Sequence, residues 1–315
     1  IIKPMKKKSL IPGLIILTGM MTIISCEKDS GNGNPPHILT ASEYLASKEE
    51  FSIFSQMLSA TDLDQVIDKG VLRIVFAPTD IAVAEFYADL GIQDMSEIPD
   101  ETLRGILLYH VVNDQLSYWP DGVYATLSPA NNNFLSMIIA YSGNESKINN
   151  YASFSGSPIY VKNVTIYPID KVLFLPTVYD LAAASGSCNI MLEAAEKTRV
   201  DEILKGNMPT TLFAPDDGAF WGLFSTLGVS GLDELTAEQL TPILKNHIAN
   251  GNVRLSGTEE FSLETLNGPV QIYSPHLDLE ESYYIGPGSR VITNNLQATN
   301  GVLHIIDVAI LDEAR

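Results

Sequence analysis

Cysteine is almost absent from this 315-residue chain, which contains only Cys26 and Cys188. Cys26 lies at the end of an N-terminal apolar leader, so the rest of the chain has one cysteine and no disulfide within it is possible. We therefore expect the folded part to depend on its hydrophobic cores. Cys188 begins a helical pattern, and we interpret it as a small buried hydrophobic residue rather than a nucleophile.

Basic residues are scarce as well, with 19 Lys and Arg against 38 Asp and Glu, which gives a formal net charge of −19. An acidic surface repels phosphate backbones and anionic lipid headgroups, so nucleic acid is excluded as a partner. The charge permits a calcium-dependent partner, but no acidic loop has EF-hand spacing. We expect neither a cofactor nor a metal.

The motifs of common enzyme classes are missing: there is no Gly-x-Ser-x-Gly elbow, phosphate-binding loop, Gly-x-Gly-x-x-Gly or His-Glu-x-x-His. No histidine or cysteine pair has metal-ligand spacing, and the five histidines are scattered at His37, His110, His247, His276 and His304. Acid pairs carry no information in so acidic a chain. We expect a protein that is not an enzyme, and a hydrolase with an unrecognised site is the least favoured alternative.

The N-terminal segment has the features of a bacterial signal peptide. A basic stretch at 6–8 follows Met5, and an apolar run extends from about Leu10 to Ile24. The run is short for a membrane-spanning helix and is interrupted by Pro12-Gly13. It ends in Ile23-Ile24-Ser25-Cys26, which resembles a lipoprotein cleavage box whose cysteine becomes lipidated.

We therefore expect a signal peptide at 1–25, followed at 26–37 by the lipidated Cys26 and a flexible tether. Removal of 1–25 leaves 15 basic against 38 acidic residues, a balance of −23. Several acyl chains on one cysteine anchor a protein stably, because each buried CH₂ adds about 0.8 kcal/mol. The expected location is the bacterial cell envelope, with the anchor in the outer membrane and the protein surface-exposed; the periplasmic face is the alternative.

The remaining sequence is a long duplication. Phe76-Ala77-Pro78-Thr79-Asp80 returns as Phe213-Ala214-Pro215-Asp216-Asp217, which is 137 positions later. The same offset relates His110 to His247 and Asp170 to Asp307. An offset of this length indicates duplicated whole domains rather than a solenoid of about 20–50-residue repeats. We expect domains at 38–175 and 176–315, called copy one and copy two below.

Each copy has a strand that runs into a helix at this motif. The β-rich run 71–76 predicts a strand, and Pro78 stops strand pairing because it has no N–H. Thr79 or Asp80 is then expected to cap the following helix, as is Asp216 or Asp217 in copy two. A metal or catalytic role for these carboxylates is the less favoured alternative.

The next helix places its histidine on an apolar face. Leu103, Ile106, Leu107 and His110 follow helical spacing, as do Leu240, Ile243, Leu244 and His247. We interpret both imidazoles as core groups bonded to backbone, and ligand or general-base roles as the alternative. Pro242 predicts that the second helix starts or kinks there, with Thr241 as a possible cap.

A β-rich half follows in each copy. Near-continuous apolar runs predict buried strands at 164–175 and 302–311, so Asp170 and Asp307 would lie inside them and tie them to the helical layer. Asn267-Gly268 and Asn300-Gly301 predict hairpin turns. The Asn- and Ser-rich region 131–157 predicts long loops or weak edge strands.

Aromatic residues in these regions are candidate contacts for a sugar or a protein partner. The candidates are Tyr118, Trp119, Tyr283 and Tyr284, and Tyr141, Tyr151, Phe154 and Tyr160 belong to the same group. Aromatic residues in a β-rich region more often belong to the core, which is the alternative for each of them.

Three sequence blocks occur in the same order in both copies, and together they resemble those of a known family. The strand into Phe-Ala-Pro-x-Asp, a Tyr-His helix such as Leu108–Val112, and an Ile-Asp block such as Tyr167–Val172 or Asn300–Asp307 resemble the fasciclin-like domain family over about 37–315. The sequence departs from the family at Asn246-His247, where the family usually has Tyr-His. The matching structural-motif positions are Phe76, Pro78, Asp80, Tyr109, His110, Asp170, Phe213, Pro215, Asp217, His247 and Asp307.

The resemblance implies an α+β fold with two tandem domains, each a β-rich wedge or sandwich packed with several short helices. It also implies adhesion or ligand binding without catalytic residues. We expect an envelope-anchored adhesion lipoprotein whose protein, matrix or glycan ligand is unknown. The alternative is an accessory glycan-binding surface lipoprotein of an outer-membrane uptake system.

Overall fold

The computed structural model describes residues 38–69, 72–113, 122–142, 145–257, 260–274 and 282–311, with the side chains of 141 and 142 excepted. Residues from Ile38 onward form one compact unit. The leader, the tether, Cys26, Tyr118 and Trp119 lie outside the described residues. In the part that is described, no helix has both the length and the apolar character needed to cross a membrane.

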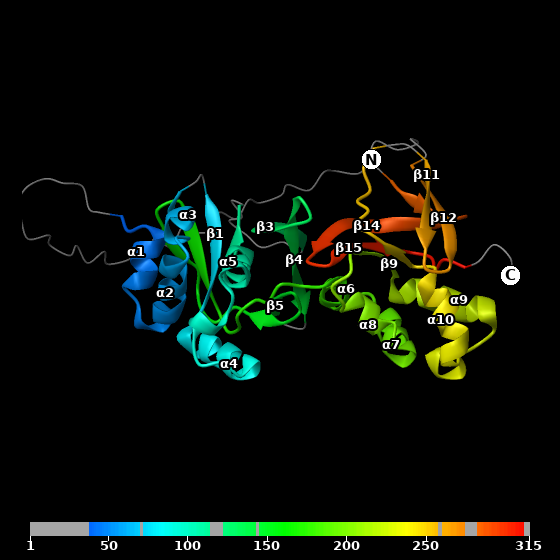
Figure 1. Cartoon of the computed structure of the whole chain (residues 1–315), viewed down its shortest axis with the longest axis horizontal. Helices are drawn as coiled ribbons and strands as arrows, with labels where there is room; N and C mark the ends of the chain where they lie inside the picture. The colour runs from blue at the N-terminus through cyan, green and yellow to red at the C-terminus, as the bar shows by residue number, and fades with distance from the viewer. Residues whose placement is uncertain are drawn as a thin grey trace, which may run out of the picture. The chain divides into compact units, whose positions relative to one another are not determined.

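Copy one begins with short helices and continues into a sheet (Figure 1). Its helices are α1 (Ala41–Ala46), η1 (Glu49–Phe51), α2 (Ser52–Ala60), α3 (Asp64–Asp68), α4 (Asp80–Leu90), η2 (Met95–Glu97) and α5 (Asp100–Tyr109). Its strands are β1 (Arg73–Pro78), β2 (Val111–Val112), β3 (Gly122–Ala130), β4 (Asn133–Ser142), β5 (Glu145–Ile148), β6 (Ala152–Ser153), β7 (Ile159–Val161) and β8 (Val164–Ile169).

Copy two repeats this order. Its helices are α6 (Val178–Ser185), α7 (Asn189–Thr198), α8 (Asp201–Leu204), α9 (Asp217–Leu227), η3 (Leu232–Glu234) and α10 (Ala237–Lys245). Its strands are β9 (Thr210–Pro215), β10 (Ile248–Asn250), β11 (Phe261–Thr265), β12 (Gly268–Tyr273), β13 (Tyr284–Ile285), β14 (Ser289–Ala298) and β15 (Gly301–Ile306). The predicted α+β class with two tandem units is confirmed.

The first strand of each copy lies beside the last. The strand order is β6-β5-β4-β3-β2-β1-β8-β7 in copy one, and the strands of copy two close into a barrel. β1 pairs in parallel with β8, where Phe76 is opposite Tyr167, and β9 pairs in parallel with β15, where Phe213 is opposite His304. Five of the six β1 residues and all six of β9 are buried, as expected for parallel strands covered on both faces.

The region 131–157 differs from its prediction as loops or weak edge strands, because much of it is sheet. β4 pairs with β3 on one side and β5 on the other. Leu135, Met137 and Ile139 alternate along β4 and are 0 to 1% exposed. This two-residue periodicity outweighs the polar Asn and Ser residues around it, so the prediction was wrong for β4, whereas the short β6 does lie at the edge of the sheet.

Two other boundaries also differ. β8 and β15 end at Ile169 and Ile306, so Asp170 and Asp307 follow the strands rather than lying inside them. Helix α10 begins at Ala237 with Thr236 as its cap and passes through Pro242. Thr241 is therefore not a cap, and its hydroxyl donates to the Ala237 carbonyl at 2.7 Å.

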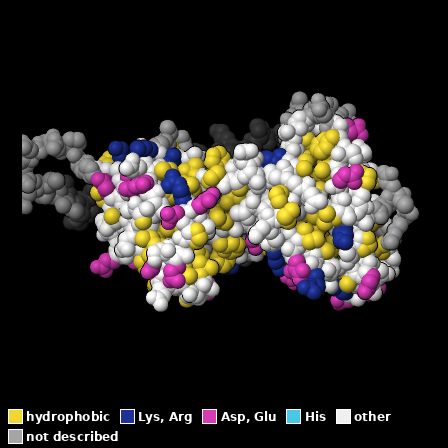
Figure 2. Space-filling model, viewed as in Figure 1, with side chains coloured by type: hydrophobic (Ala, Val, Ile, Leu, Met, Phe, Trp, Pro, Cys, Tyr) yellow, Lys and Arg dark blue, Asp and Glu magenta, His cyan; other side chains and the backbone are white. Residues whose placement is uncertain are grey.

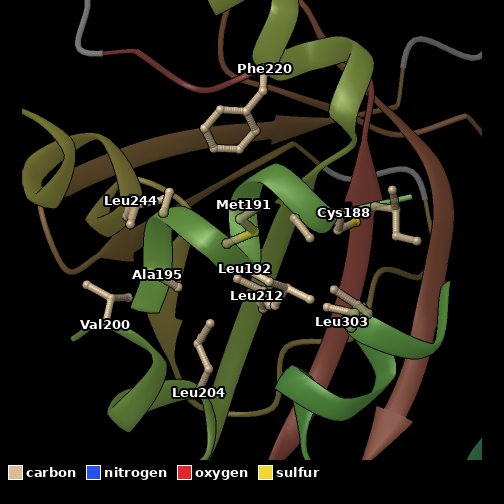
Figure 3. Close-up of a cluster of buried hydrophobic side chains, with 14 of the residues drawn as sticks. Cys188, Met191, Leu192, Ala195, Val200, Leu204, Leu212, Phe220, Leu244 and Leu303 are labelled. Atoms are coloured by element: carbon tan, nitrogen blue, oxygen red, sulfur yellow. The ribbon is translucent and has the colours of Figure 1, made fainter. Parts of the chain in front are cut away.

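One of the hydrophobic clusters of copy two surrounds α7 (Figure 3). Met191, Leu192 and Ala195 from this helix face Leu212 of β9 and Leu303 of β15, with Phe220 of α9 above them in the view. Cys188 belongs to the same cluster and is fully buried. Burial raises the pKa of its thiol to about 11, which fits the interpretation of a small core residue.

Candidate functional site

At the strand-to-helix turn of copy one, the side chains of the adjacent residues Thr79 and Asp80 make hydrogen bonds to different helices. Thr79 is the N-cap of α4, and its hydroxyl accepts a hydrogen bond from the Ala82 amide at 3.3 Å. Asp80 does not cap this helix. Its carboxylate accepts from the Ser52 hydroxyl at 2.6 Å and from the Ile53 amide at 2.9 Å, which fixes the start of α2.

Copy two repeats this division. Asp216 caps α9 by accepting from the Ala219 amide at 2.7 Å. Asp217 accepts from the Ile190 amide at 2.8 Å and from the Asn189 side chain at 2.9 Å, which fixes the start of α7. In both copies the aspartate at the second position of the pair joins two helices, so its carboxylate has a structural explanation.

His110 and His247 are buried and bonded on both ring nitrogens. The Nδ1 of His110 lies 2.8 Å from the Ile106 carbonyl, and its Nε2 accepts from the Leu173 amide at 3.0 Å. His247 makes the same contacts with the Ile243 carbonyl and the Ile310 amide, both at 2.8 Å. An amide donor at Nε2 requires a neutral ring with its proton on Nδ1. Burial lowers the pKa of both to about 4.

His304 is a third buried imidazole. Its Nε2 donates to the Val253 carbonyl at 3.0 Å, and its Nδ1 accepts from the Asn295 amide at 3.2 Å. The ring stacks on Phe213 with centroids 5.2 Å apart, and burial lowers its pKa to about 4. Sequence reasoning gave this histidine no role, although its place in an apolar strand was a signal for burial.

Asp170 and Asp307 connect strands rather than the strand and helical layers that the sequence predicted. Asp170 accepts from the Ser153 amide at 2.7 Å, and Asp307 accepts from the Arg290 amide at 2.8 Å. Asp307 also accepts from Nε of Arg290 at 3.2 Å. Each carboxylate lies just beyond its strand, where it reaches another strand instead of a helix: Asp170 reaches β6, and Asp307 reaches β14.

Tyr109 and Asn246 occupy matching positions and make different contacts. The Tyr109 hydroxyl donates to the Ser136 carbonyl at 2.8 Å and accepts from the Asn149 side chain at 2.8 Å. Burial raises the pKa of this phenol. In copy two the Asn246 amide donates to the Ile310 carbonyl at 3.3 Å, and its oxygen accepts from Asn267 at 2.8 Å.

An open groove of about 540 Å³ lies where two signature blocks of copy one meet. The strand-to-helix turn contributes Thr79, and the Ile-Asp block contributes Asp170 and Lys171. The other lining residues are Glu50, Ile81, Glu85, Ser155, Gly156, Ser157, Ile159 and Pro168. Lys171 pairs with Glu85 at 2.5 Å across it, and that hydrogen bond raises the pKa of Lys171.

The groove differs between the copies in its side chains. Ile81 is 75% exposed, yet the position 137 later is Gly218. The positions that match Glu85 and Lys171 are Gly222 and Val308, so copy two has no ion pair there. The groove of copy one therefore carries apolar and charged groups that the shared fold does not require.

The predicted aromatic contacts fall into different environments. Tyr283 is only 4% exposed and packs in the core of copy two, which is the alternative that the sequence offered for it. Tyr284 is half-buried and stacks on Tyr273 at 5.5 Å. Tyr151 lies edge-on to Phe174 at 5.2 Å, and both are 40% exposed.

The viewed surface carries acidic, basic and apolar side chains interspersed over both copies (Figure 2). Tyr160 of β7 is 73% exposed, and Trp221 of α9 is 58% exposed. Among the residues described, no three His, Cys, Asp or Glu side chains gather in a group suited to a metal ion.

Comparisons with known proteins match each of the two copies separately. The family model described as Fasciclin domain matches twice, at residues 49–176 and 186–312. Protein sll1483 of Synechocystis sp. (strain ATCC 27184 / PCC 6803 / Kazusa) is 25% identical over 135 residues, which cover 43% of this chain and 73% of that protein. Uncharacterized protein sll1735 of the same strain is 27% identical over 143 residues, which cover 44% of this chain and 98% of that protein.

A solved FAS1 domain pair from the insect cell adhesion molecule fasciclin I covers 86% of this chain and 96% of its own. Its sequence identity is 17% and its TM-score is 0.47. The two family matches together span most of the sequence, in the order that the duplicated motifs indicate. The chain therefore belongs to the fasciclin domain family and carries two tandem fasciclin domains.

Proposed function

We propose that the chain is a cell-envelope adhesion or binding lipoprotein that acts through non-catalytic fasciclin domains and is anchored by lipid on Cys26. Family membership supports the adhesive role. The histidines support a role without catalysis, because His110, His247 and His304 are buried and use both ring nitrogens on backbone groups. A general base must instead reach the proton that it abstracts.

The groove of copy one is the proposed ligand-binding site. It joins an exposed apolar side chain, Ile81, to the Lys171–Glu85 ion pair, and copy two lacks all three side chains. Since the fold forms without them in copy two, these side chains are available for recognition. Surface sites on a rigid scaffold commonly serve this purpose.

A panel of immobilised extracellular-matrix proteins tests this proposal with purified protein that starts at residue 26. Ile81→Asp and Lys171→Glu are expected to weaken binding, because one removes the apolar contact and the other places two acids side by side. Trp221→Ser in copy two is the matched surface control and should bind as the parent does. Equal binding by all four proteins would exclude the groove as the ligand site.

Glycan binding beside an uptake system is the second candidate function. It is favoured by the exposed Tyr151–Phe174 pair, since aromatic rings of this kind can contact sugar faces. A glycan array decides between the two candidates. Selective binding that Tyr151→Ala abolishes would favour the glycan role, and an array without signal would leave protein adhesion as the function. Trp119→Ala is a second variant for the array.

Anchoring and orientation have separate tests. Cys26→Ser should move the protein from the membrane fraction to the soluble fraction, and a variant that still sediments with membranes would contradict the lipid anchor. Protease treatment of intact cells then reports orientation. Digestion of the wild-type protein is expected for surface display, and protection would place the domains on the periplasmic side.

A further inference from the structure

A pocket of about 250 Å³ lies in copy two, beside β12 and the residue that precedes His247. None of the described residues that line it has a charged side chain, and they combine apolar side chains with two amide side chains and backbone groups. The lining residues are Asn246, Gly268, Pro269, Val270, Gln271, Gly286, Pro287, Ile310 and Leu311. It is separate from the groove of copy one.

Shared hydrogen bonds align this pocket with copy one residue by residue. The Gly286 amide donates to the Gln271 carbonyl at 2.7 Å, and the Asn149 amide donates to the Ile138 carbonyl at 2.7 Å. Pairing around the hairpins agrees, because Val270 is opposite Leu263 just as Met137 is opposite Tyr124. Asn246 therefore matches Tyr109, Gly286 matches Asn149, and Gly268 matches Leu135.

Copy one fills the matching space with side chains. Tyr109 is fully buried there, and its hydroxyl lies 2.8 Å from both the Ser136 carbonyl and the Asn149 side chain. The Asn149 oxygen also accepts from the Ile138 amide at 2.8 Å. In copy two Asn246 stands in place of the tyrosine, and two glycines stand in place of Asn149 and the matching leucine. These smaller residues leave the space open as a pocket.

We propose that this pocket binds a neutral phenolic ring, either the tyrosine side chain of a partner protein or a free phenol. Its volume suffices, because a cavity of about 150 Å³ accommodates benzene. Val270 and Ile310 offer apolar contact to the ring and are 8% and 4% exposed. The proposed binding site in copy two thus corresponds to the space that the Tyr109 side chain fills in copy one.

The polar groups suit a hydroxyl. The Pro269 carbonyl corresponds to the Ser136 carbonyl that accepts from Tyr109, and the Gln271 amide corresponds to the Ile138 amide that donates to Asn149. A phenolic hydroxyl can donate to the first and accept from the second. The described lining residues carry no charge, which disfavours a carboxylate, phosphate or ammonium ligand, because a charge buried without a partner is costly.

Titration with p-cresol, followed by ¹H–¹⁵N NMR, tests the proposal. Saturable shifts are expected at the Gly268, Gln271 and Gly286 amides. Toluene has the same ring without the hydroxyl and should bind at least about tenfold more weakly, which is the value of one hydrogen bond near 1.4 kcal/mol. N-acetyl-tyrosinamide distinguishes the sources: if it binds as p-cresol does, a partner's tyrosine can enter, and if only p-cresol binds, the ligand is a free phenol.

Two variants close the pocket with the side chains of copy one. Asn246→Tyr places the ring inside, and Gly286→Asn restores the amide at a residue whose φ of +57° is close to the +52° of Asn149. Each should abolish the p-cresol shifts while the protein stays folded, and Gly286→Asn serves if Asn246→Tyr does not fold. Trp221→Ser leaves the pocket unchanged and should bind normally.

Three results would overturn the proposal. One is the absence of saturable shifts at these amides with millimolar p-cresol. Another is p-cresol binding that survives in folded Asn246→Tyr or Gly286→Asn. The third is toluene binding as tight as that of p-cresol. None of them bears on the groove of copy one, whose variants are assayed on different ligands.

Discussion

The imidazole of His110 accepts a hydrogen bond from the backbone amide of Leu173, 63 residues further along the chain. His247 accepts from Ile310 across the same separation. In each copy one ring thus joins the end of a helix to the segment that follows the last strand. The bond exists only while Nε2 lacks a proton. The stability of the protein in acid therefore depends on these rings.

Acid is therefore expected to destabilise both domains. The folded pKa of His110, His247 and His304 is lowered to about 4 from 6.5, so the folded state binds fewer protons than the unfolded state. Their contribution is complete above pH 6.5 and is lost as the pH falls toward 4, on the order of 3 kcal/mol for each ring. Urea unfolding at several pH values measures it, and His247→Gln should reduce the slope between pH 6.5 and 4.

Loss of the Asp80 carboxylate should loosen the start of α2. Asp80→Ala removes acceptors for the Ser52 hydroxyl and the Ile53 amide and is expected to cost about 2 kcal/mol. Asp80→Asn keeps one oxygen and should cost less. Chemical denaturation gives both values. If the two substitutions cost the same, the carboxylate does not act through these bonds.

Removal of the Tyr109 hydroxyl tests the buried bond that copy two lacks. Tyr109→Phe leaves the Ser136 carbonyl and the Asn149 side chain without this partner, and we expect a loss of about 1–2 kcal/mol. Tyr151→Phe, at a residue that is 40% exposed, is the control and should change stability by less than about 0.5 kcal/mol. Calorimetry of both variants makes the comparison.

Cys188 should be inert in the native protein. It is fully buried, and burial raises the pKa of its thiol to about 11, so the reactive thiolate is rare at neutral pH. In the Cys26→Ser variant, which leaves Cys188 as the one thiol, a thiol-specific chromogenic reagent should label the protein only after unfolding in guanidinium. Rapid labelling in native buffer would show that the core around α7 opens.

Gly301 should tolerate no side chain. A Cβ on this residue would lie 1.8 Å from the Thr210 carbonyl oxygen, and its φ is +151°. Gly301→Ala is expected to cost more than about 3 kcal/mol or to prevent copy two from folding. Gly257→Ala, with a φ of +71° and open space around it, should cost only about 1 kcal/mol. Thermal unfolding compares the two.

The sequence was most informative where one local pattern had one structural solution. Helical spacing placed His110 and His247 in the core, and the strand–proline–acid order predicted the caps at Thr79 and Asp216. The strand β4 was missed because Asn and Ser around it suggested loops, although the alternation of Leu135, Met137 and Ile139 was present.

The candidate sites were harder to predict, because they depend on which distant residues meet. Nothing local indicates that Asp170 reaches Ser153, or that Lys171 pairs with Glu85. The pocket of copy two had one visible sign, the Asn246 that stands where the family usually has tyrosine. Its shape also depends on Gly268 and Gly286, whose proximity to Asn246 arises only in the folded hairpins.

The parallel pairing of β1 with β8 has a consequence for synthesis on the ribosome. β1 is the first strand of its domain and β8 the last, so about 90 residues must emerge between the two halves of this pairing. Until then the apolar edge of β1 has no parallel neighbour, and the nascent domain is open to chaperones. Closure by the final strand thus delays folding of the domain until its translation is complete.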